Sequence, residues 1–154
     1  RILAQLQHYK KHAQHYSDVI SLLNKIFENN FPDIVSLNML SLKEICDYLQ
    51  INTPIKIFSQ NRIDIEPVNA PDEWALNICK VMEANEYWNP PGGKEFFNPH
   101  KFDDNNIALK FHKIKLQQYD QKRSGFEPGL SIVDVMMFND PEKINRMLEE
   151  YELC

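Results

Sequence analysis

Glycine is distributed very unevenly along this chain of 154 residues. All four glycines lie between Gly92 and Gly129, and residues 1–91 contain none. Glycine adopts positive φ angles easily and lets another backbone or a ligand approach closely. The sequence therefore predicts that unusual backbone conformations are concentrated in the later part of the chain.

The first third of the chain has the periodicity of helices. Apolar residues recur three and four positions apart in three segments, from Ile2 to Tyr16, from Val19 to Phe27 and from Leu42 to Leu49. Ser41 and Glu44 have the spacing of a capping box before the third segment. We therefore expect three amphipathic helices within residues 1–50.

After residue 50, segments typical of strands alternate with segments typical of helices. Residues 54–59, 85–88 and 107–116 are expected to be strands, the last with a bulge near His112. Helices are expected after Pro71, from Ser131 to Phe138, and from Pro141 to Tyr151. Strands separated by helices pair in parallel through right-handed crossovers. We therefore predict a single α/β domain over residues 1–154, with a helical part (1–50) and an α/β part (51–154) whose small sheet is mostly parallel and has flanking helices.

Composition argues against several classes of protein. The chain has 17 basic and 22 acidic residues, a net charge of -5, which disfavours a large nucleic-acid-binding surface. Its apolar runs are shorter than the roughly 18 residues of a membrane helix. The three cysteines are far apart and include no CxxC pair, so a disulfide framework is not indicated. We expect a cytoplasmic protein without a membrane span.

Three histidines, His8, His12 and His15, lie at positions i, i+4 and i+7 of the first expected helix. Two histidines four residues apart can hold one zinc ion. The third would lie about 10 Å from the first along a helix axis, so one ion cannot easily use all three. We expect a solvated helix flank and no bound metal, although a two-histidine site is the alternative.

Three further features allow both a structural and a functional interpretation. The segment Asn89–Gly93 is either a tight turn or a loop whose backbone approaches a ligand at the end of a strand. Asp134, three residues after Ser131, is either half of a reciprocal helix cap or a carboxylate held for chemistry. Tyr119 and Gln121 lie in a basic loop that is either solvated or suited to an anionic sugar nucleotide or a polymer phosphate.

Segments spread over nearly all of the chain resemble the WbqC-like family of bacteria and archaea. They are Leu42–Leu49, Ile78–Lys80, Tyr87–Gly93, Tyr119–Gln121, Phe126–Pro128, Leu130–Asp134, Met137–Asn139 and Met147–Leu153. Gln50 replaces a usual glycine, Trp74 stands where arginine is frequent, and Gly129 stands where tryptophan is frequent. The family's opening strand has no counterpart after Arg1. We therefore expect a chain that resembles the last two-thirds of the family domain and needs a further N-terminal segment to function.

The resemblance implies a role in the biosynthesis of bacterial surface polysaccharides such as O-antigen and lipopolysaccharide. One reaction class that fits is transfer of an acyl or aminoacyl group to an amino sugar, without metal or cofactor. The alternative is a non-catalytic protein of the same pathway that binds a sugar nucleotide or other pathway proteins. No catalytic residue is assigned.

We expect the ligand site where the turn, the basic loop and the start of the Ser131 helix meet. The amides at that helix start suit an anionic group, and the loop side chains suit sugar hydroxyls. The predicted ligand-binding residues are Asn89, Gly92, Gly93, Tyr119, Gln121 and Ser131.

Overall fold

The structure, a computed structural model, describes residues 2–61 and 63–154. These residues form two compact units with separate apolar cores. Unit 1 combines the chain up to Ile57 with Leu116–Glu149, and unit 2 combines Phe58–Lys115 with Glu150–Cys154. That the chain is a single domain stays a prediction, and each unit is described by itself below.

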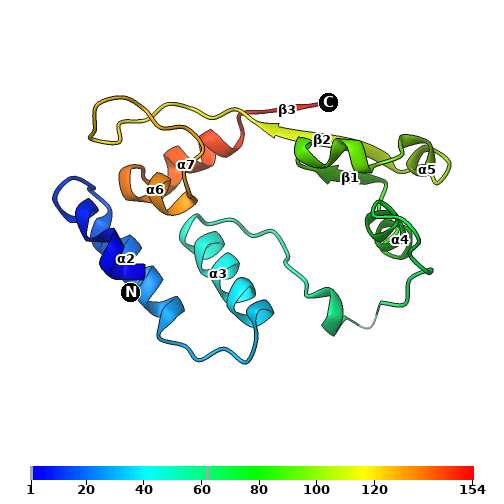
Figure 1. Ribbon diagram of the computed structural model, residues 1–154, viewed down its shortest axis with the longest axis horizontal. Helices are drawn as coiled ribbons and strands as arrows, with labels where there is room; N and C mark the ends of the chain where they lie inside the picture. Colours follow the sequence, from blue (N-terminus) through cyan, green and yellow to red (C-terminus); the bar gives the residue numbers. More distant parts are fainter. Residues whose placement is uncertain (1, 62) are drawn as a thin grey trace. The chain divides into compact units, whose positions relative to one another are not determined.

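Unit 1 is helical. It contains α1 (Ile2–Gln5), the 3-10 helix η1 (Leu6–Lys11), α2 (Tyr16–Phe27), α3 (Ile34–Tyr48), α6 (Ile132–Phe138) and α7 (Pro141–Leu148). Figure 1 shows α2 beside α3 and α6, and α2 contacts both helices. The core between them consists of fully buried apolar side chains, including Val19, Ile26, Leu49, Met136, Met137 and Ile144. The helical N-terminal third is thus completed by two helices from the end of the chain.

Two helices of unit 1 differ from the sequence prediction, the first in its type and the third in where it begins. The first expected helix is one α-helical turn followed by a 3-10 helix, which ends before α2. Helix α3 begins at Ile34, because the Asp33 carboxylate accepts a hydrogen bond from the Ser36 backbone N–H (2.7 Å) and caps the helix there. Ser41 lies inside α3, where its hydroxyl donates to the Leu37 carbonyl (2.8 Å).

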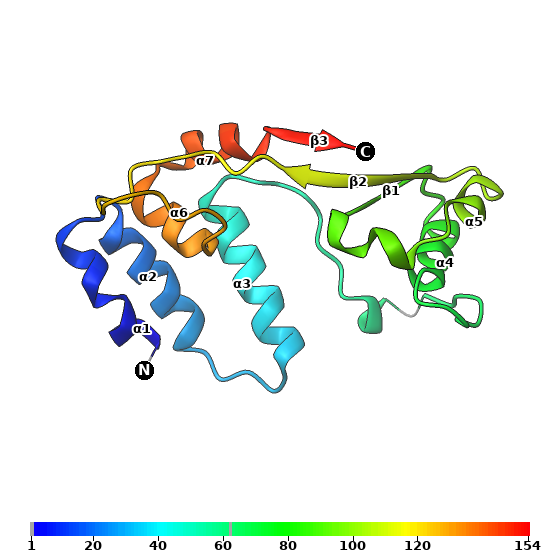
Figure 2. The same cartoon turned by 45° about the horizontal axis from the view of Figure 1, so that its top comes forward.

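Unit 2 contains a three-stranded sheet in the order β1-β2-β3, formed by β1 (Glu86–Asn89), β2 (Ala108–Ile114) and β3 (Tyr151–Leu153). Its helices are η2 (Phe58–Gln60), α4 (Glu73–Val81), η3 (Pro91–Phe96) and α5 (Pro99–Asp103). Strand β1 pairs with β2 in parallel, and β2 pairs with β3 in antiparallel orientation. Figure 2 shows the sheet with α4 and α5 near one end.

The mixed helix and sheet composition agrees with the predicted α/β class, but the sheet is mixed and not mostly parallel. Residues 54–57 have no regular structure and Phe58–Gln60 is a 3-10 helix, so the expected strand over 54–59 is wrong. Tyr151, expected in the last helix, lies in β3 because α7 ends at Leu148 and the chain then pairs with β2. The register of β2 with β3 is continuous, and Ile114 and Leu116 are exposed in place of the expected bulge.

Positive φ angles are not confined to the glycine-containing part of the chain. Gln50 (φ 59°) and Glu83 (φ 52°) adopt them, as do Asn106 and Lys122. Gln50 follows the end of α3, where its N–H donates to the Asp47 carbonyl (3.1 Å) and the Ile51 N–H donates to the Cys46 carbonyl (2.8 Å). This is the Schellman pattern, which requires a left-handed residue after a helix. Helix ends thus account for positive φ angles that the glycine count missed.

Candidate functional site

Asp134 is a buried carboxylate in the first turn of α6. The helix begins after Ser131, whose hydroxyl oxygen accepts a hydrogen bond from the Val133 N–H (3.3 Å). Only 6% of Asp134 is exposed. Its side chain accepts hydrogen bonds from the hydroxyls of Tyr9 (2.6 Å) and Tyr119 (2.5 Å) and a longer one from the Gln121 amide (3.3 Å). Three separate segments of unit 1 thus meet at one carboxylate.

This geometry changes the interpretation of Asp134 as half of a reciprocal cap. Ser131 does cap α6, but the Asp134 carboxylate does not return the bond within the described residues. Its partners are the Tyr9, Tyr119 and Gln121 side chains, and only its backbone N–H bonds to the Ser131 carbonyl (2.9 Å). The second interpretation, a carboxylate held at a buried helix start, fits the contacts better.

The donors to Asp134 are neutral. Burial, helped by the hydrogen bond to Asp134, raises the pKa of Tyr119 to about 12. The same two causes, burial first, raise the pKa of Tyr9 well above its ordinary value. Both phenols therefore keep their protons at neutral pH and act as donors. Within residues 2–61 and 63–154, no Lys, Arg or His forms an ion pair with Asp134.

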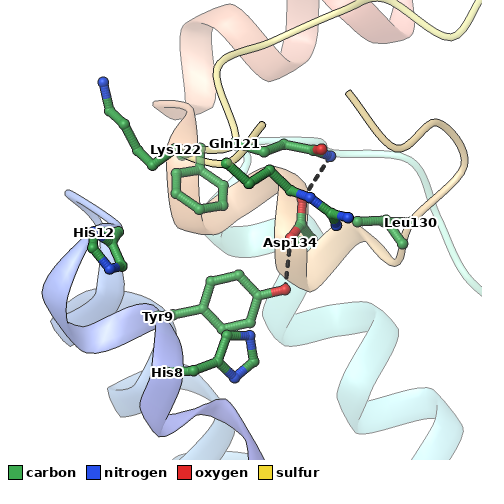
Figure 3. A pocket seen from close by; sticks show the side chains of 9 residues that line it. His8, Tyr9, His12, Gln121, Lys122, Leu130 and Asp134 are labelled. Atoms are coloured by element: carbon green, nitrogen blue, oxygen red, sulfur yellow. Dashed lines mark hydrogen bonds between the residues drawn. The ribbon is translucent and has the colours of Figure 1, made fainter. Parts of the chain in front are cut away.

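The carboxylate lines a pocket of about 370 Å³ (Figure 3). Figure 3 shows Tyr9 reaching Asp134 from the N-terminal segment, with His8 beside it. Apolar and cationic side chains share the lining, which consists of His8, Tyr9, His12, Gln121, Lys122, Arg123, Leu130, Asp134 and Phe138. Among the described residues Asp134 Oδ2 accepts one hydrogen bond, from Tyr9, so it keeps a lone pair for one further donor.

Arg123 is the cation of this pocket that is available to a ligand. Lys122 is committed to an ion pair with Asp120 (2.5 Å). Arg123 is exposed, and within the described part of the chain it has no ion-pair or hydrogen-bond partner. It also lines a second pocket, of about 350 Å³, on the same loop. Its planar guanidinium suits paired oxygens of a carboxylate or phosphate.

His8 has a defined hydrogen-bond partner. Its Nδ1 lies 2.8 Å from the Gln5 carbonyl oxygen, so Nδ1 carries the proton in this bond. In the neutral ring, Nε2 then has the lone pair and can accept a proton or a hydrogen bond. The ring also lies against Tyr9, with centroids 4.1 Å apart.

Gln121 shapes the loop that carries Arg123. Its Oε1 accepts from the Glu127 N–H (2.9 Å), and its Nε2 donates to the Glu127 carbonyl (3.0 Å) and the Tyr119 hydroxyl (3.2 Å). The loop turns at Lys122, whose N–H donates to the Asp120 carboxylate (2.8 Å) at a φ of 54°. Gln121 therefore holds the loop closed as well as lining the pocket.

The predicted site residues fall into two groups. Tyr119, Gln121, Ser131 and Asp134 belong to unit 1, where Gln121 and Asp134 line the pocket and Tyr119 supports them. Asn89, Gly92 and Gly93 belong to unit 2. That the two groups share one ligand site stays a prediction.

The contacts of the second group are local. The side-chain oxygen Oδ1 of Asn89 accepts from the Tyr87 hydroxyl (3.1 Å), and its side-chain Nδ2 donates to the Pro90 backbone carbonyl (2.9 Å). A Cβ at Gly93 would lie 2.5 Å from the Asn89 amide nitrogen, whereas one at Gly92 would meet nothing within 4 Å. Packing against Asn89 thus explains Gly93 and leaves Gly92 without a structural reason.

Sequence reasoning missed Tyr9 and Arg123 as site residues, and it predicted His8 and His12 to lie on a solvated helix flank, with a two-histidine metal site as the alternative. Tyr9 appears in the sequence as one more member of an apolar helical stripe. It is 125 residues from Asp134, and no spacing rule joins such positions. Within the described residues, no group of three or more His, Cys, Asp or Glu side chains could hold a metal ion.

None of the helices in the described part of the chain has both the length and the apolar character needed to cross a membrane. Residues 1–146 match the WbqC-like protein family. The chain is also 30% identical to "Uncharacterized protein Rv1507c" of Mycobacterium tuberculosis over 129 residues. This matched stretch covers 82% of the chain and 54% of that protein. The chain thus spans about half the length of this curated relative. No solved structure matches this chain significantly. With the family match extending over nearly every residue, the chain belongs to the WbqC-like protein family.

Proposed function

We propose that this chain binds a sugar nucleotide in the Asp134 pocket and acts in a cytoplasmic step of bacterial surface-polysaccharide biosynthesis, such as that of O-antigen or lipopolysaccharide. The observation that carries the proposal is a buried carboxylate, held by neutral donors, in the same pocket as Arg123, which has no ion-pair or hydrogen-bond partner among the described residues. The assignment to this pathway rests on the family resemblance. We propose other proteins of the same pathway as partners.

The two charged groups suit the two ends of such a ligand. The free lone pair of Asp134 Oδ2 suits a hydroxyl or amino group of the sugar. The Arg123 guanidinium suits the phosphate oxygens, which a planar fork of donors can bind in pairs. Leu130 and Phe138 supply apolar lining beside these polar groups, the usual composition of a small-molecule site.

The reaction we propose is acyl or aminoacyl transfer to an amino sugar. The amine nitrogen attacks the acyl carbonyl, a C–N bond forms, and the bond to the donor's leaving group breaks with its electron pair. The amine proton must pass to an acceptor, and His8 Nε2 has the free lone pair for this role. Neither a metal nor a redox cofactor is needed for this chemistry.

A binding protein without catalysis is the second candidate. The three hydrogen bonds that Asp134 accepts favour this candidate, since a carboxylate stabilised in this way is a well-positioned acceptor for a ligand. In this case the chain would deliver a sugar nucleotide to another protein of the pathway.

Calorimetric titration with uridine-, thymidine-, guanosine- and cytidine-linked amino sugars tests the binding step. We expect Arg123→Gln to weaken binding about tenfold or more, since it removes a charged partner of the phosphates. Arg146→Gln is the matched control, because Arg146 is an exposed arginine of α7 paired with Glu142 (2.5 Å). The proposal fails if no sugar nucleotide binds or if the two variants lose the same affinity.

Adding acyl and aminoacyl donors to a bound amino-sugar nucleotide separates the two candidates. A product heavier by the acyl group in mass spectrometry identifies a transferase, and His8→Gln should then slow turnover with little change in binding. Binding without product across the donor panel favours the non-catalytic protein.

A further inference from the structure

One face of the sheet in unit 2 carries a cluster of aromatic rings. This face bears one ring from each strand, Trp88 on β1, His112 on β2 and Tyr151 on β3. We call these three side chains the ring platform. The other face of the sheet bears Tyr87 and Phe111, and the Tyr87 ring contacts Phe97 and Phe102 while the Phe111 ring contacts Phe97.

The three rings of the platform contact one another. The Trp88 and His112 rings are stacked, with centroids 6.0 Å apart and planes inclined by 24°. The Tyr151 ring lies 4.5 Å from His112 and 5.8 Å from Trp88. Trp88 is nevertheless 41% exposed and Tyr151 36% exposed. Large aromatic side chains gathered on an exposed face are typical of binding surfaces.

Charged neighbours hold Trp88 in place. Its indole N–H donates to the Glu86 carboxylate (3.0 Å), and Glu86 also pairs with Lys110, whose ammonium lies 5.8 Å from the centre of the indole ring. A ring fixed in this way loses little conformational freedom when a ligand covers it. The platform is therefore preorganised.

The charges beside the platform determine what it can bind. Glu86 and Lys110 form an ion pair beside the indole ring, so neither presents a single unpaired charge to a ligand that covers Trp88. The Lys110 ammonium has further donor hydrogens and the Glu86 oxygens have further lone pairs. The matching ligand is uncharged, with one apolar face to cover a ring and hydroxyl groups around its edge. A pyranose ring has this chemistry.

We propose that the ring platform binds an uncharged oligosaccharide by stacking pyranose rings on Trp88 and Tyr151. This inference rests on the proposed function, because a protein of polysaccharide biosynthesis meets a glycan as well as a sugar nucleotide. It adds a second carbohydrate site, in unit 2, that is distinct from the Asp134 pocket of unit 1. Glu86 and Lys110 would bond to the sugar hydroxyls.

Tryptophan fluorescence tests the inference directly, since the chain has only two tryptophans. Trp74→Phe leaves Trp88 as the single reporter. Titration with triacetylchitotriose and maltotriose should change its emission with a saturable, millimolar dependence for at least one of the sugars. Trp88→Ala and Tyr151→Ala, followed by calorimetry, should weaken binding about tenfold or more. Trp74→Ala is the matched control, because Trp74 is 52% exposed in unit 2 but lies on α4.

Each outcome supports or overturns the inference. Binding that is lost in Trp88→Ala, kept in Trp74→Ala and kept in Arg123→Gln supports a glycan site separate from the pocket. Equal binding by the wild type and Trp88→Ala, or no binding of either sugar, overturns it, even where sugar nucleotides still bind to the pocket. Self-association that Trp88→Ala abolishes, without sugar binding, would assign the face to a protein interface and overturn it as well.

Discussion

Asp134 in unit 1 and Asp72 in unit 2 are both buried carboxylates at the start of a helix, but their partners differ. Asp72 is 3% exposed, and its carboxylate accepts from the Lys101 ammonium (3.1 Å) and the Asn98 N–H (3.1 Å). Lys101 also pairs with Glu73 (2.9 Å). Asp134 has two phenols and an amide as partners and, within the described residues, no cation.

The difference separates a structural carboxylate from one suited to binding. A buried charge is costly unless it is paired, and Lys101 supplies that pairing for Asp72. Among the described residues, the hydrogen-bond donors to Asp134 are all neutral, and Oδ2 accepts one bond, from Tyr9, which leaves it capacity for a further donor. An unneutralised carboxylate in a pocket is a candidate ligand-binding group, whereas an ion-paired one connects segments of the fold.

The largest effect is expected for Asp72→Asn. It removes the charge that Lys101 pairs with, so we expect unfolding free energy to fall by about 2–3 kcal/mol, less than for a wholly buried pair because Lys101 keeps Glu73. Asp134→Asn should cost only about 1 kcal/mol, since the phenol hydroxyls can rotate to bond a neutral amide. Urea unfolding measures both. The comparison breaks down if Asp134→Asn proves the more destabilising.

The next effect concerns the loop that supports the Asp134 pocket. Gln121→Ala removes both bonds to the Glu127 backbone and leaves part-buried backbone groups without these partners. We expect a loss of about 1–3 kcal/mol in unfolding free energy. Gln117→Ala, at an exposed position just before the loop, should change it by less than about 0.5 kcal/mol. Equal stability of the two variants would mean that Gln121 serves the ligand and not the loop.

Local signals in the sequence predicted much of the fold. Ser131 and Pro141 were expected at the starts of helices and lie at the starts of α6 and α7. The strands near residues 85–88 and 107–116 are present, and their parallel pairing is confirmed. These features depend on residues close together in the chain, such as caps, prolines and alternating apolar positions.

Features that depend on distant residues were missed. Strand β3 looks like the end of a helix because Tyr151 continues the apolar spacing of α7, and only pairing with β2 makes it a strand. Residues 54–57 include isoleucines typical of a strand, but this segment has no regular secondary structure. The contact of Tyr9 with Asp134 arises from packing of unit 1, which short-range patterns do not encode.

The pH dependence of stability further separates Asp134 from Asp72, because Asp134 accepts hydrogen bonds from phenols whereas Asp72 is bonded to Lys101 and to the Asn98 backbone. The pKa of Tyr119 is raised to about 12 by burial and the bond to Asp134, against about 10 in an unfolded chain. The folded state therefore holds this proton more tightly. Its contribution to stability is complete below pH 10 and is lost as pH rises from about 10 to 12.

Tyr119→Phe should flatten this alkaline loss of stability, measured by urea unfolding at a series of pH values. Tyrosinate absorbance near 295 nm should show one fewer phenol titrating above pH 11. Tyr16→Phe is the control, because the Tyr16 hydroxyl has no hydrogen-bond partner among the described residues. An identical slope for both variants would show that the Asp134 cluster does not hold the Tyr119 proton.

The smallest effect concerns a feature that the two units share. Helix α3 of unit 1 and α4 of unit 2 both end in a Schellman pattern with a residue at positive φ, Gln50 and Glu83. A side chain in this conformation costs roughly 1–2 kcal/mol, which glycine avoids, but glycine gives back about 0.4–1 kcal/mol through the freedom of the unfolded chain. Gln50→Gly should therefore stabilise the protein by about 0.5–1 kcal/mol.

Glu83→Gly should stabilise by a similar amount, because its N–H bonds to the Lys80 carbonyl (3.2 Å) as that of Gln50 does to Asp47. Gln50→Ala is the control, since alanine keeps a Cβ and gains nothing at positive φ. Differential scanning calorimetry can resolve a rise of a few degrees for each glycine variant. If the two units unfold separately, each substitution should raise only the transition of its own unit. If both variants instead shift one common transition, the two units unfold together. The contrast between Asp72 and Asp134 is then one of local chemistry within a single cooperative structure.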